Sequence, residues 1–222
     1  MSDINCFYKG VFVLENMLNH LQEILAQPMS LFALLAMALF IVAFFYSRKI
    51  KLTTNMLVYT ALMLALTIVL HQLRIYHMPQ GGSVTLGSML PLLFLSFRYG
   101  PGIGFLAGFL YGMINLLQDP FILHPVQVLF DYPLPYMVLG IAGFFPGRYL
   151  LGAILGVSVR FLCHFISGIV FFASYAPAGT SPYLYAFIFN ASYLVPELLI
   201  CLLLLKVLPV QRLLSYMKIT RQ

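Results

Sequence analysis

The chain has 222 residues, of which 62% are hydrophobic and only 8% are charged, and its mean hydropathy is +0.96. Soluble domains carry about a quarter charged residues, so this composition excludes a soluble globular protein and indicates several membrane-spanning segments. The formal net charge of +6 does not indicate nucleic-acid binding, because the basic residues are scattered and fall at the ends of apolar segments.

The N-terminal part is expected to contain two helices. Residues 10–27 predict an amphipathic interfacial helix, and an apolar run over 29–47 predicts a spanning helix. A signal peptide is the less favoured interpretation, because Asp3 interrupts the basic region that such a peptide needs. Residues 1–50 are therefore expected to form an N-terminal segment that precedes a membrane domain over 51–222.

Apolar runs near 20 residues, separated by polar or Gly/Pro clusters, mark the spans of this membrane domain. Six are predicted: 55–74, 84–98, 101–117, 125–145, 149–174 and 183–208. The fold class is therefore an all-α polytopic membrane protein, a six-helix bundle with one extra N-terminal transmembrane helix. The cysteines show no metal or redox spacing and are interpreted as packing residues: Cys6, Cys163 and Cys201.

Lysine and arginine predict the orientation of the spans. If the "RKIK" segment at 48–51 is cytoplasmic, nine basic residues fall inside and only Lys9 and Arg74 fall outside, with Arg160 within a span. Such a positive-inside bias predicts that the C-terminus lies in the cytoplasm. Three loops rich in Gly, Pro and aromatic residues then face outward: "HMPQGGS", "QDPFILHP" and "SYAPAGTSP".

Polar side chains in the outer half of three spans predict a binding pocket. From the helical rise, Asp131 lies roughly 9 Å from the outer end of its span, Asn190 roughly 10 Å and His164 roughly 15 Å. Aromatic residues accompany them in the sequence: Tyr132, Tyr185 and Phe172. Ionisable residues within spans are costly and usually functional. An outward-facing polar pocket with aromatic walls is expected.

The stretch "HPVQVLFDYPLPY" at 124–136 combines Asp131 with a weakened helix. Pro133 and Pro135 lack backbone donors, which frees the carbonyls of Leu129 and Asp131, and broken backbone at membrane depth is tolerated where it lines a cavity. The matching ligand is cationic, aromatic and hydrogen-bonding. The alternative is that Asp131 is a structural partner of Arg74 or His164.

Two further buried charges lie deeper. Arg160 and Glu197 are expected to form a structural ion pair, because a lone buried charge is costly; Glu197 as a coupling-ion site is the alternative. Arg160 belongs to a stripe with a four-residue spacing that continues through His164, Gly168 and Phe172. Gly168 serves either helix packing or a ligand that needs the missing side chain.

At these residues the sequence resembles the thiamine-specific substrate-binding (S) component of energy-coupling factor (ECF) transporters. The resemblance covers about 55–208 and is carried by four segments: "MPQGGS" (78–83), "HPVQVLFDYPL" (124–134), "RFLCHFISGIVFFASYAP" (160–177) and "YAFIFNASYLVPE" (185–197). It implies a six-helix S-component bundle that captures thiamine from outside and delivers it inward. The substrate-binding residues that it implies are Phe121, Asp131, Tyr132, His164, Gly168, Phe172, Tyr185 and Asn190.

The resemblance also implies partners. These are an ECF transmembrane coupling subunit and two ABC-type ATPase subunits, since the chain has no P-loop of its own. Ala61 and Ala65 match the Ala-xxx-Ala face that meets the coupling subunit in this family. No catalytic residue, metal ligand or cofactor is predicted. The chain departs from the family in having Asp131 where Glu is usual and no tryptophan at all, with Phe172 replacing one of them.

Other function classes fit less well. A stand-alone secondary transporter for a thiamine precursor or another small aromatic cation is the main alternative, but the sequence shows no repeated halves. An intramembrane enzyme would need a motif such as H-E-x-x-H or G-x-S-x-G, and none occurs. A pure scaffold protein would have no small-molecule ligand.

Overall fold

The computed structural model describes residues 52–217. The described residues all belong to one compact unit. The interfacial helix predicted over 10–27, the extra span predicted over 29–47 and the N-terminal segment predicted over 1–50 lie outside the described residues.

Four of the predicted spans are confirmed as helices long and apolar enough to cross a membrane. They are α3 (Thr54–Gln72), α5 (Pro101–Gln118), α8 (Tyr149–Phe171) and α9 (Pro182–Val207). Helix α3 begins at Thr53, whose hydroxyl accepts a hydrogen bond from the backbone N–H of Met56. Apolar side chains cover much of the outer surface of these helices, as lipid contact requires.

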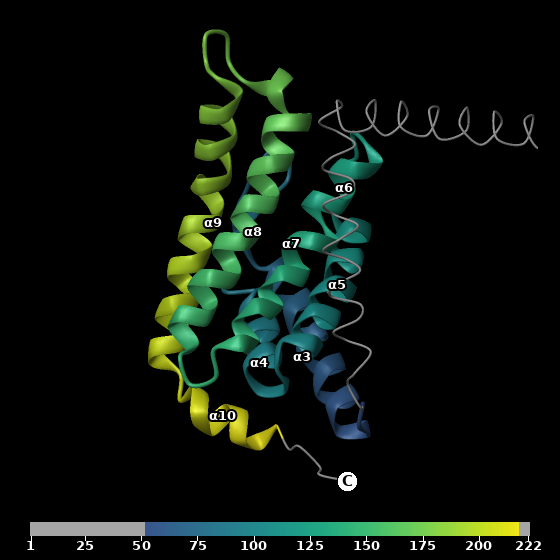
Figure 1. The fold of residues 1–222 in the computed structure, drawn as a ribbon, viewed down its shortest axis with the longest axis vertical. Coiled ribbons are helices and arrows are strands. Elements are labelled where there is room, and N and C mark those ends of the chain that lie inside the picture. The colour runs from purple at the N-terminus through teal and green to yellow at the C-terminus, as the bar shows by residue number, and fades with distance from the viewer. Residues whose placement is uncertain (1–51, 218–222) are drawn as a thin grey trace, which may run out of the picture. The chain divides into compact units, whose positions relative to one another are not determined.

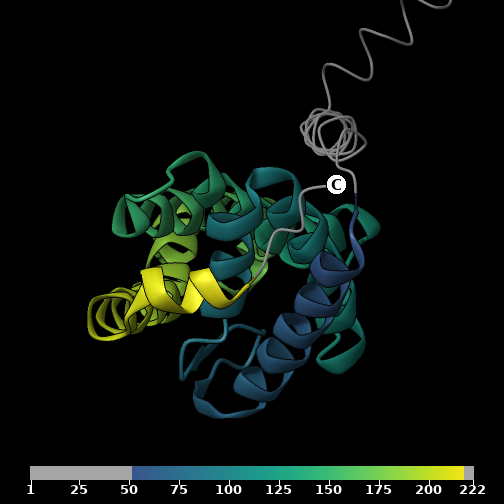
Figure 2. The same ribbon diagram turned by 90° about the horizontal axis from the view of Figure 1, so that it is seen from below.

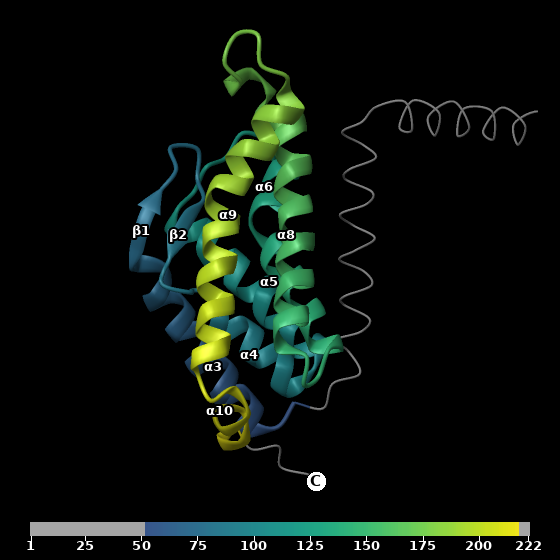
Figure 3. The same cartoon turned by 90° about the vertical axis from the view of Figure 1, so that its left-hand side faces the viewer.

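The predicted span over 84–98 is wrong in its first part. A hairpin of β1 (Arg74–His77) and β2 (Ser83–Thr85) comes first, and α4 begins only at Leu90 and ends at Tyr99. Gly81, Gly82 and Gly87 have φ near +90°, a conformation that glycine adopts easily and that a helix cannot contain. The segment therefore turns back on itself beside α9 (Figure 3).

The predicted span over 125–145 is divided into three short helices: α6 (Pro125–Asp131), α7 (Pro133–Met137) and the 3₁₀ helix η1 (Val138–Phe144). The interruption falls at Tyr132, directly before Pro133. Proline removes a backbone donor and disfavours the helical conformation of the residue before it, so the weakening expected from the two prolines is present.

Small residues allow the helices to approach closely. Helix α5 packs on α7 and η1, and α8 packs along α9 (Figure 1). At Gly112 an added Cβ would lie 2.5 Å from the carbonyl oxygen of Tyr132, so only glycine fits there. The missing side chain of Gly112 therefore allows α5 to lie directly against the backbone at the start of α7.

The two ends of the bundle differ. The 119–124 loop and the α8–α9 connection, which contains η2 (Ala173–Tyr175), lie at one end, and α10 (Val210–Tyr216) lies at the other (Figure 1). Seen from below, α10 crosses the helix ends (Figure 2). The Tyr59 hydroxyl donates to the Tyr216 carbonyl at 2.7 Å, and Arg98 Nε donates to the Met217 carbonyl at 2.5 Å. These bonds fix α10 against α3 and α4.

Candidate functional site

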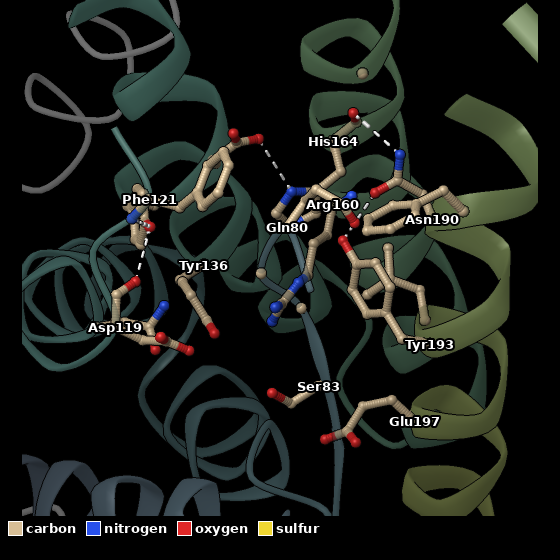
Figure 4. Close-up of a pocket in the computed structure, with 18 of the residues that line it drawn as sticks. Gln80, Ser83, Asp119, Phe121, Tyr136, Arg160, His164, Asn190, Tyr193 and Glu197 are labelled. Carbon is tan, nitrogen blue, oxygen red and sulfur yellow. Dashed lines mark hydrogen bonds and ion pairs between the residues drawn. The ribbon is translucent and has the colours of Figure 1, made fainter. Parts of the chain in front are cut away.

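A pocket among the helices collects all eight residues predicted to bind substrate. It is bordered by the hairpin turn, the 119–124 loop and helices α3 and α5–α9 (Figure 4). The predicted residues that line it are Phe121, Asp131, Tyr132, His164, Gly168, Phe172, Tyr185 and Asn190. Residues from four separate segments of the sequence therefore meet in one space.

Asp131 and His164 form the polar centre of the pocket. His164 Nδ1 lies 3.4 Å from Asp131 Oδ1, and Gln127 Nε2 donates to Asp131 Oδ2 at 2.6 Å. The side chains of Asp131 and His164 are only 17% and 10% exposed. The alternative expectation that Asp131 partners His164 is thus compatible with this geometry, whereas Arg74 pairs with Asp119 at 2.9 Å instead.

Aromatic rings form the wall near the 119–124 loop. Phe121 stacks on Phe172 with ring centroids 5.7 Å apart and an interplanar angle of 24°. Tyr175 completes this cluster at 5.7 Å from Phe172 and 6.4 Å from Phe121. Because the negative faces of such rings attract cations, this wall suits a flat, positively charged ligand.

Asn190 lies where α8 and α9 pack together. Its Nδ2 donates to the carbonyl oxygens of Ala186 at 2.8 Å and His164 at 3.3 Å, and its Oδ1 accepts from the Tyr193 hydroxyl at 2.8 Å. The amide nitrogen is therefore occupied, and the oxygen retains one acceptor position. Gly168 faces the same contact and leaves room for the amide of Asn190.

The two predicted tyrosines differ in their surroundings. The Tyr132 hydroxyl accepts from the Phe121 backbone N–H at 2.6 Å and donates to the Asp119 carbonyl at 2.8 Å, so it holds the 119–124 loop. Tyr185 is half-buried and lies 5.7 Å from Phe189, ring centroid to ring centroid. The structure gives hydrogen bonds for the hydroxyl of Tyr132 but not for that of Tyr185.

The ion pair predicted between Arg160 and Glu197 is not formed among the described residues. The Glu197 carboxylate accepts from Thr85 N at 2.5 Å, Thr85 Oγ1 at 2.6 Å and Ser88 Oγ at 3.3 Å. The Arg160 guanidinium instead lies 4.0 Å from the centre of the Tyr136 ring. The hairpin segment supplies donors that sequence reasoning did not assign to Glu197, so the carboxylate is satisfied without an arginine.

Both charged residues nevertheless line the pocket. The Arg160 side chain extends into it (Figure 4), and its Nε and Nη1 have no hydrogen-bond partner. Arg160 and Glu197 are 7% and 3% exposed, so the inner part of the pocket holds opposite charges in a nearly dry environment.

Several lining residues were missed by the sequence reasoning. Gln127 precedes Asp131 by four residues, a spacing that places both on one helix face. Phe189 and Tyr193 follow Tyr185 at the same spacing and lead to Glu197, so α9 carries a pocket-facing stripe like that of α8. The spacing was a signal for these residues, whereas nothing local indicated that Tyr136 or His71 would reach the pocket.

The two predicted docking residues are exposed. Ala61 and Ala65 lie on the outer surface of α3, next to exposed Leu62 and Leu66. This surface is open to lipid or to a partner helix.

The fold and the pocket define a class of protein: a largely helical, multi-pass membrane protein with a polar, aromatic-lined binding pocket among its helices. Residues 57–216 match the family described as "Thiamine transporter protein (Thia_YuaJ)", and the chain belongs to this family. The family is one of transport proteins, not enzymes. The resemblance expected from the sequence is therefore confirmed for the family.

Individual relatives agree. The chain is 37% identical to the thiamine transporter ThiT of Bacillus subtilis (strain 168), covering 58% of this chain and 75% of that protein. It is 28% identical to the thiamine transporter ThiT of Lacticaseibacillus paracasei, covering 46% and 61%. A solved structure of ThiT from Listeria monocytogenes is similar with a TM-score of 0.65, covering 73% of this chain and 96% of that one, at 21% identity. At that identity the similarity shows the fold.

Proposed function

We propose that this chain is the thiamine-binding S component of an ECF-type importer in a prokaryotic cell membrane. It captures thiamine at the outer face and delivers it inward while docked on an energising module. The observation that carries the proposal is the pocket itself, in which Asp131, His164 and Asn190 meet the aromatic wall of Phe121 and Phe172. Membership of the thiamine transporter family supports the choice of ligand.

Thiamine matches this chemistry. Its thiazolium ring is a permanent cation, and its aminopyrimidine ring carries both donors and acceptors. Asp131 provides the negative charge or a hydrogen-bond acceptor, the free acceptor position of Asn190 Oδ1 suits an amino group, and the phenylalanine rings stack on the flat ligand. Asp119, another carboxylate of the pocket, is already paired with Arg74 at 2.9 Å. Asp131 is therefore the more available charge.

Transport requires partners that this chain does not contain. We infer that the small side chains of Ala61 and Ala65 on exposed α3 dock on the transmembrane coupling subunit, which is joined to two ABC-type ATPase subunits. The close approach that small residues permit supports this assignment. The positive-inside distribution supports a cytoplasmic C-terminus, which would place the 119–124 loop on the outside.

Thiamine binding by the purified full-length chain tests the proposal, measured by calorimetry in detergent. We expect tight binding by the wild type and a loss of about tenfold to a hundredfold for Asp131→Asn, the range expected for a hydrogen bond to a charged group. Asp119→Asn is the matched control and should lose less, because that carboxylate serves Arg74. Folded wild-type protein that does not bind thiamine would reject the ligand assignment.

Uptake distinguishes this function from a stand-alone secondary transporter. Proteoliposomes that contain the chain alone should not accumulate thiamine, and accumulation should require the coupling and ATPase subunits with ATP. Accumulation by the chain alone, driven by a proton gradient, would favour the secondary transporter.

A further inference from the structure

The 119–124 loop has no helix or strand of its own, yet it supplies Phe121 to the aromatic wall. Gln127 is one of the side chains that hold it. This residue is fully buried, its Nε2 donates to the Phe121 carbonyl at 3.0 Å, and its Oε1 accepts from the Leu123 N–H at 3.0 Å. The same Nε2 donates to Asp131 Oδ2 at 2.6 Å. One amide therefore joins the loop to the pocket carboxylate.

The orientation of this amide follows from its partners. A backbone N–H can only donate and a carboxylate can only accept, so the oxygen of Gln127 must face Leu123 and its nitrogen must face Asp131. Both amide hydrogens and the oxygen are then used. Because Gln127 has no freedom to turn, Asp131 is held from the Oδ2 side while Oδ1 faces His164 at 3.4 Å.

The partner of Asp131 differs in charge from the partner of Asp119, the other carboxylate near this loop. Asp119 is paired with the cationic Arg74, which opposes its charge. Gln127 is neutral, so its hydrogen bond orients Asp131 without cancelling the negative charge. Such a hydrogen bond to a charged group is among the stronger ones in proteins.

We propose that Gln127 is a positioning residue for ligand binding: it fixes the carboxylate of Asp131 toward the pocket and, through the same amide, fixes Phe121 in the aromatic wall. The inference rests on the proposed function, since it concerns the site that binds thiamine. Gln127 acts through Asp131 and the loop and is not itself assigned a contact with the ligand.

A double-mutant cycle on thiamine affinity tests this role in the full-length chain. Gln127→Leu should weaken thiamine binding by about tenfold to a hundredfold when Asp131 is present. In the Asp131→Asn chain, the same change should cost at most about threefold, because the charged group that Gln127 orients is gone. If Gln127→Leu does not fold, Gln127→Met replaces it, since methionine keeps the length of the side chain and has no donor for Asp131.

Tyr132→Phe is the matched control. Its hydroxyl bonds the Phe121 N–H and the Asp119 carbonyl and makes no hydrogen bond to the Asp131 side chain, so it reports the loop alone. We expect its effect on affinity to be similar with and without the Asp131→Asn change.

The outcomes separate two failures. Suppose that wild type binds thiamine and that the Gln127 change lowers the affinity equally with Asp131 and with Asp131→Asn, as expected for the Tyr132 change. Gln127 then only holds the loop, and the positioning role is rejected while the proposed function stands. If folded wild type does not bind thiamine, the proposed function fails, and this inference fails with it. If the loss of thiamine affinity caused by the Gln127 change depends strongly on Asp131, and the loss caused by the Tyr132 change does not, the positioning role is supported.

Discussion

The contact between α8 and α9 at Gly168 leads to a quantitative prediction. A Cβ at this position would lie 2.8 Å from the Cβ of Ala186 and 3.3 Å from Asn190 Nδ2. Carbon atoms in contact prefer a separation of about 3.5–4.0 Å, so Gly168→Ala must push the two helices apart or distort them. Overpacking of this kind costs about 1–3 kcal/mol.

Gly156→Ala provides the control on the same helix. A Cβ there would lie 3.4 Å from the Cα and carbonyl oxygen of Leu139, close to ordinary contact. Each substitution also replaces glycine by alanine inside a helix, which by itself stabilises by about 0.5–1 kcal/mol. This gain is common to both variants and cancels in their comparison, so the difference between them measures the clash at Gly168.

The assay is thermal unfolding of wild type and both variants in the same detergent. For a chain of this length, 1 kcal/mol corresponds to about 2–4 °C, so Gly168→Ala should unfold roughly 2–12 °C below Gly156→Ala. Thiamine binding should weaken in Gly168→Ala as well, because Asn190 shares the contact. Equal unfolding temperatures for the two variants would refute the packing argument.

Two further predictions concern the inner and outer parts of the pocket. Thr85→Val removes a hydroxyl that donates to Glu197 at 2.6 Å and should destabilise the chain by about 1.5–3 kcal/mol in thermal unfolding. Thr67→Val, whose hydroxyl bonds only a carbonyl of its own helix, should change stability less, and equal losses would argue against a special role for the Glu197 cluster. Phe172→Leu should weaken thiamine binding roughly 2–30-fold in calorimetry through loss of a cation–π contact. Phe165→Leu on α8, outside the pocket lining, should bind like wild type, and unchanged binding by Phe172→Leu would exclude Phe172 from the ligand contacts.

Much of the helical framework could be predicted from the sequence because its causes are local. Apolar runs long enough to span a membrane gave α3, α5, α8 and α9. The interruption at Tyr132 followed from the prolines after it, since a missing backbone donor weakens a helix wherever it occurs. The pocket-facing stripe of α8 was also evident, because side chains four residues apart share one helix face.

The sequence alone misled where distant segments meet. The span predicted over 84–98 included Val84 and Thr85, but residues 83–85 pair with Arg74–His77 as a hairpin and bring Thr85 to Glu197, 112 residues away. The Glu197 carboxylate needed donors, and sequence reasoning chose Arg160 because a buried charge usually finds an opposite one. Backbone and hydroxyl donors from the hairpin segment satisfy it instead.

The sequence by itself thus determined which residue types the pocket contains and which helix faces carry them. Only the tertiary structure decided which of these residues are free for a ligand. The Tyr132 hydroxyl bonds the backbone of the 119–124 loop, Asp119 pairs with the cationic Arg74, and Asp131 accepts a hydrogen bond from the neutral amide of Gln127. The physical reason is that a hydrogen bond depends on where its partner lies in space, and for most of these groups the partner comes from another segment of the chain.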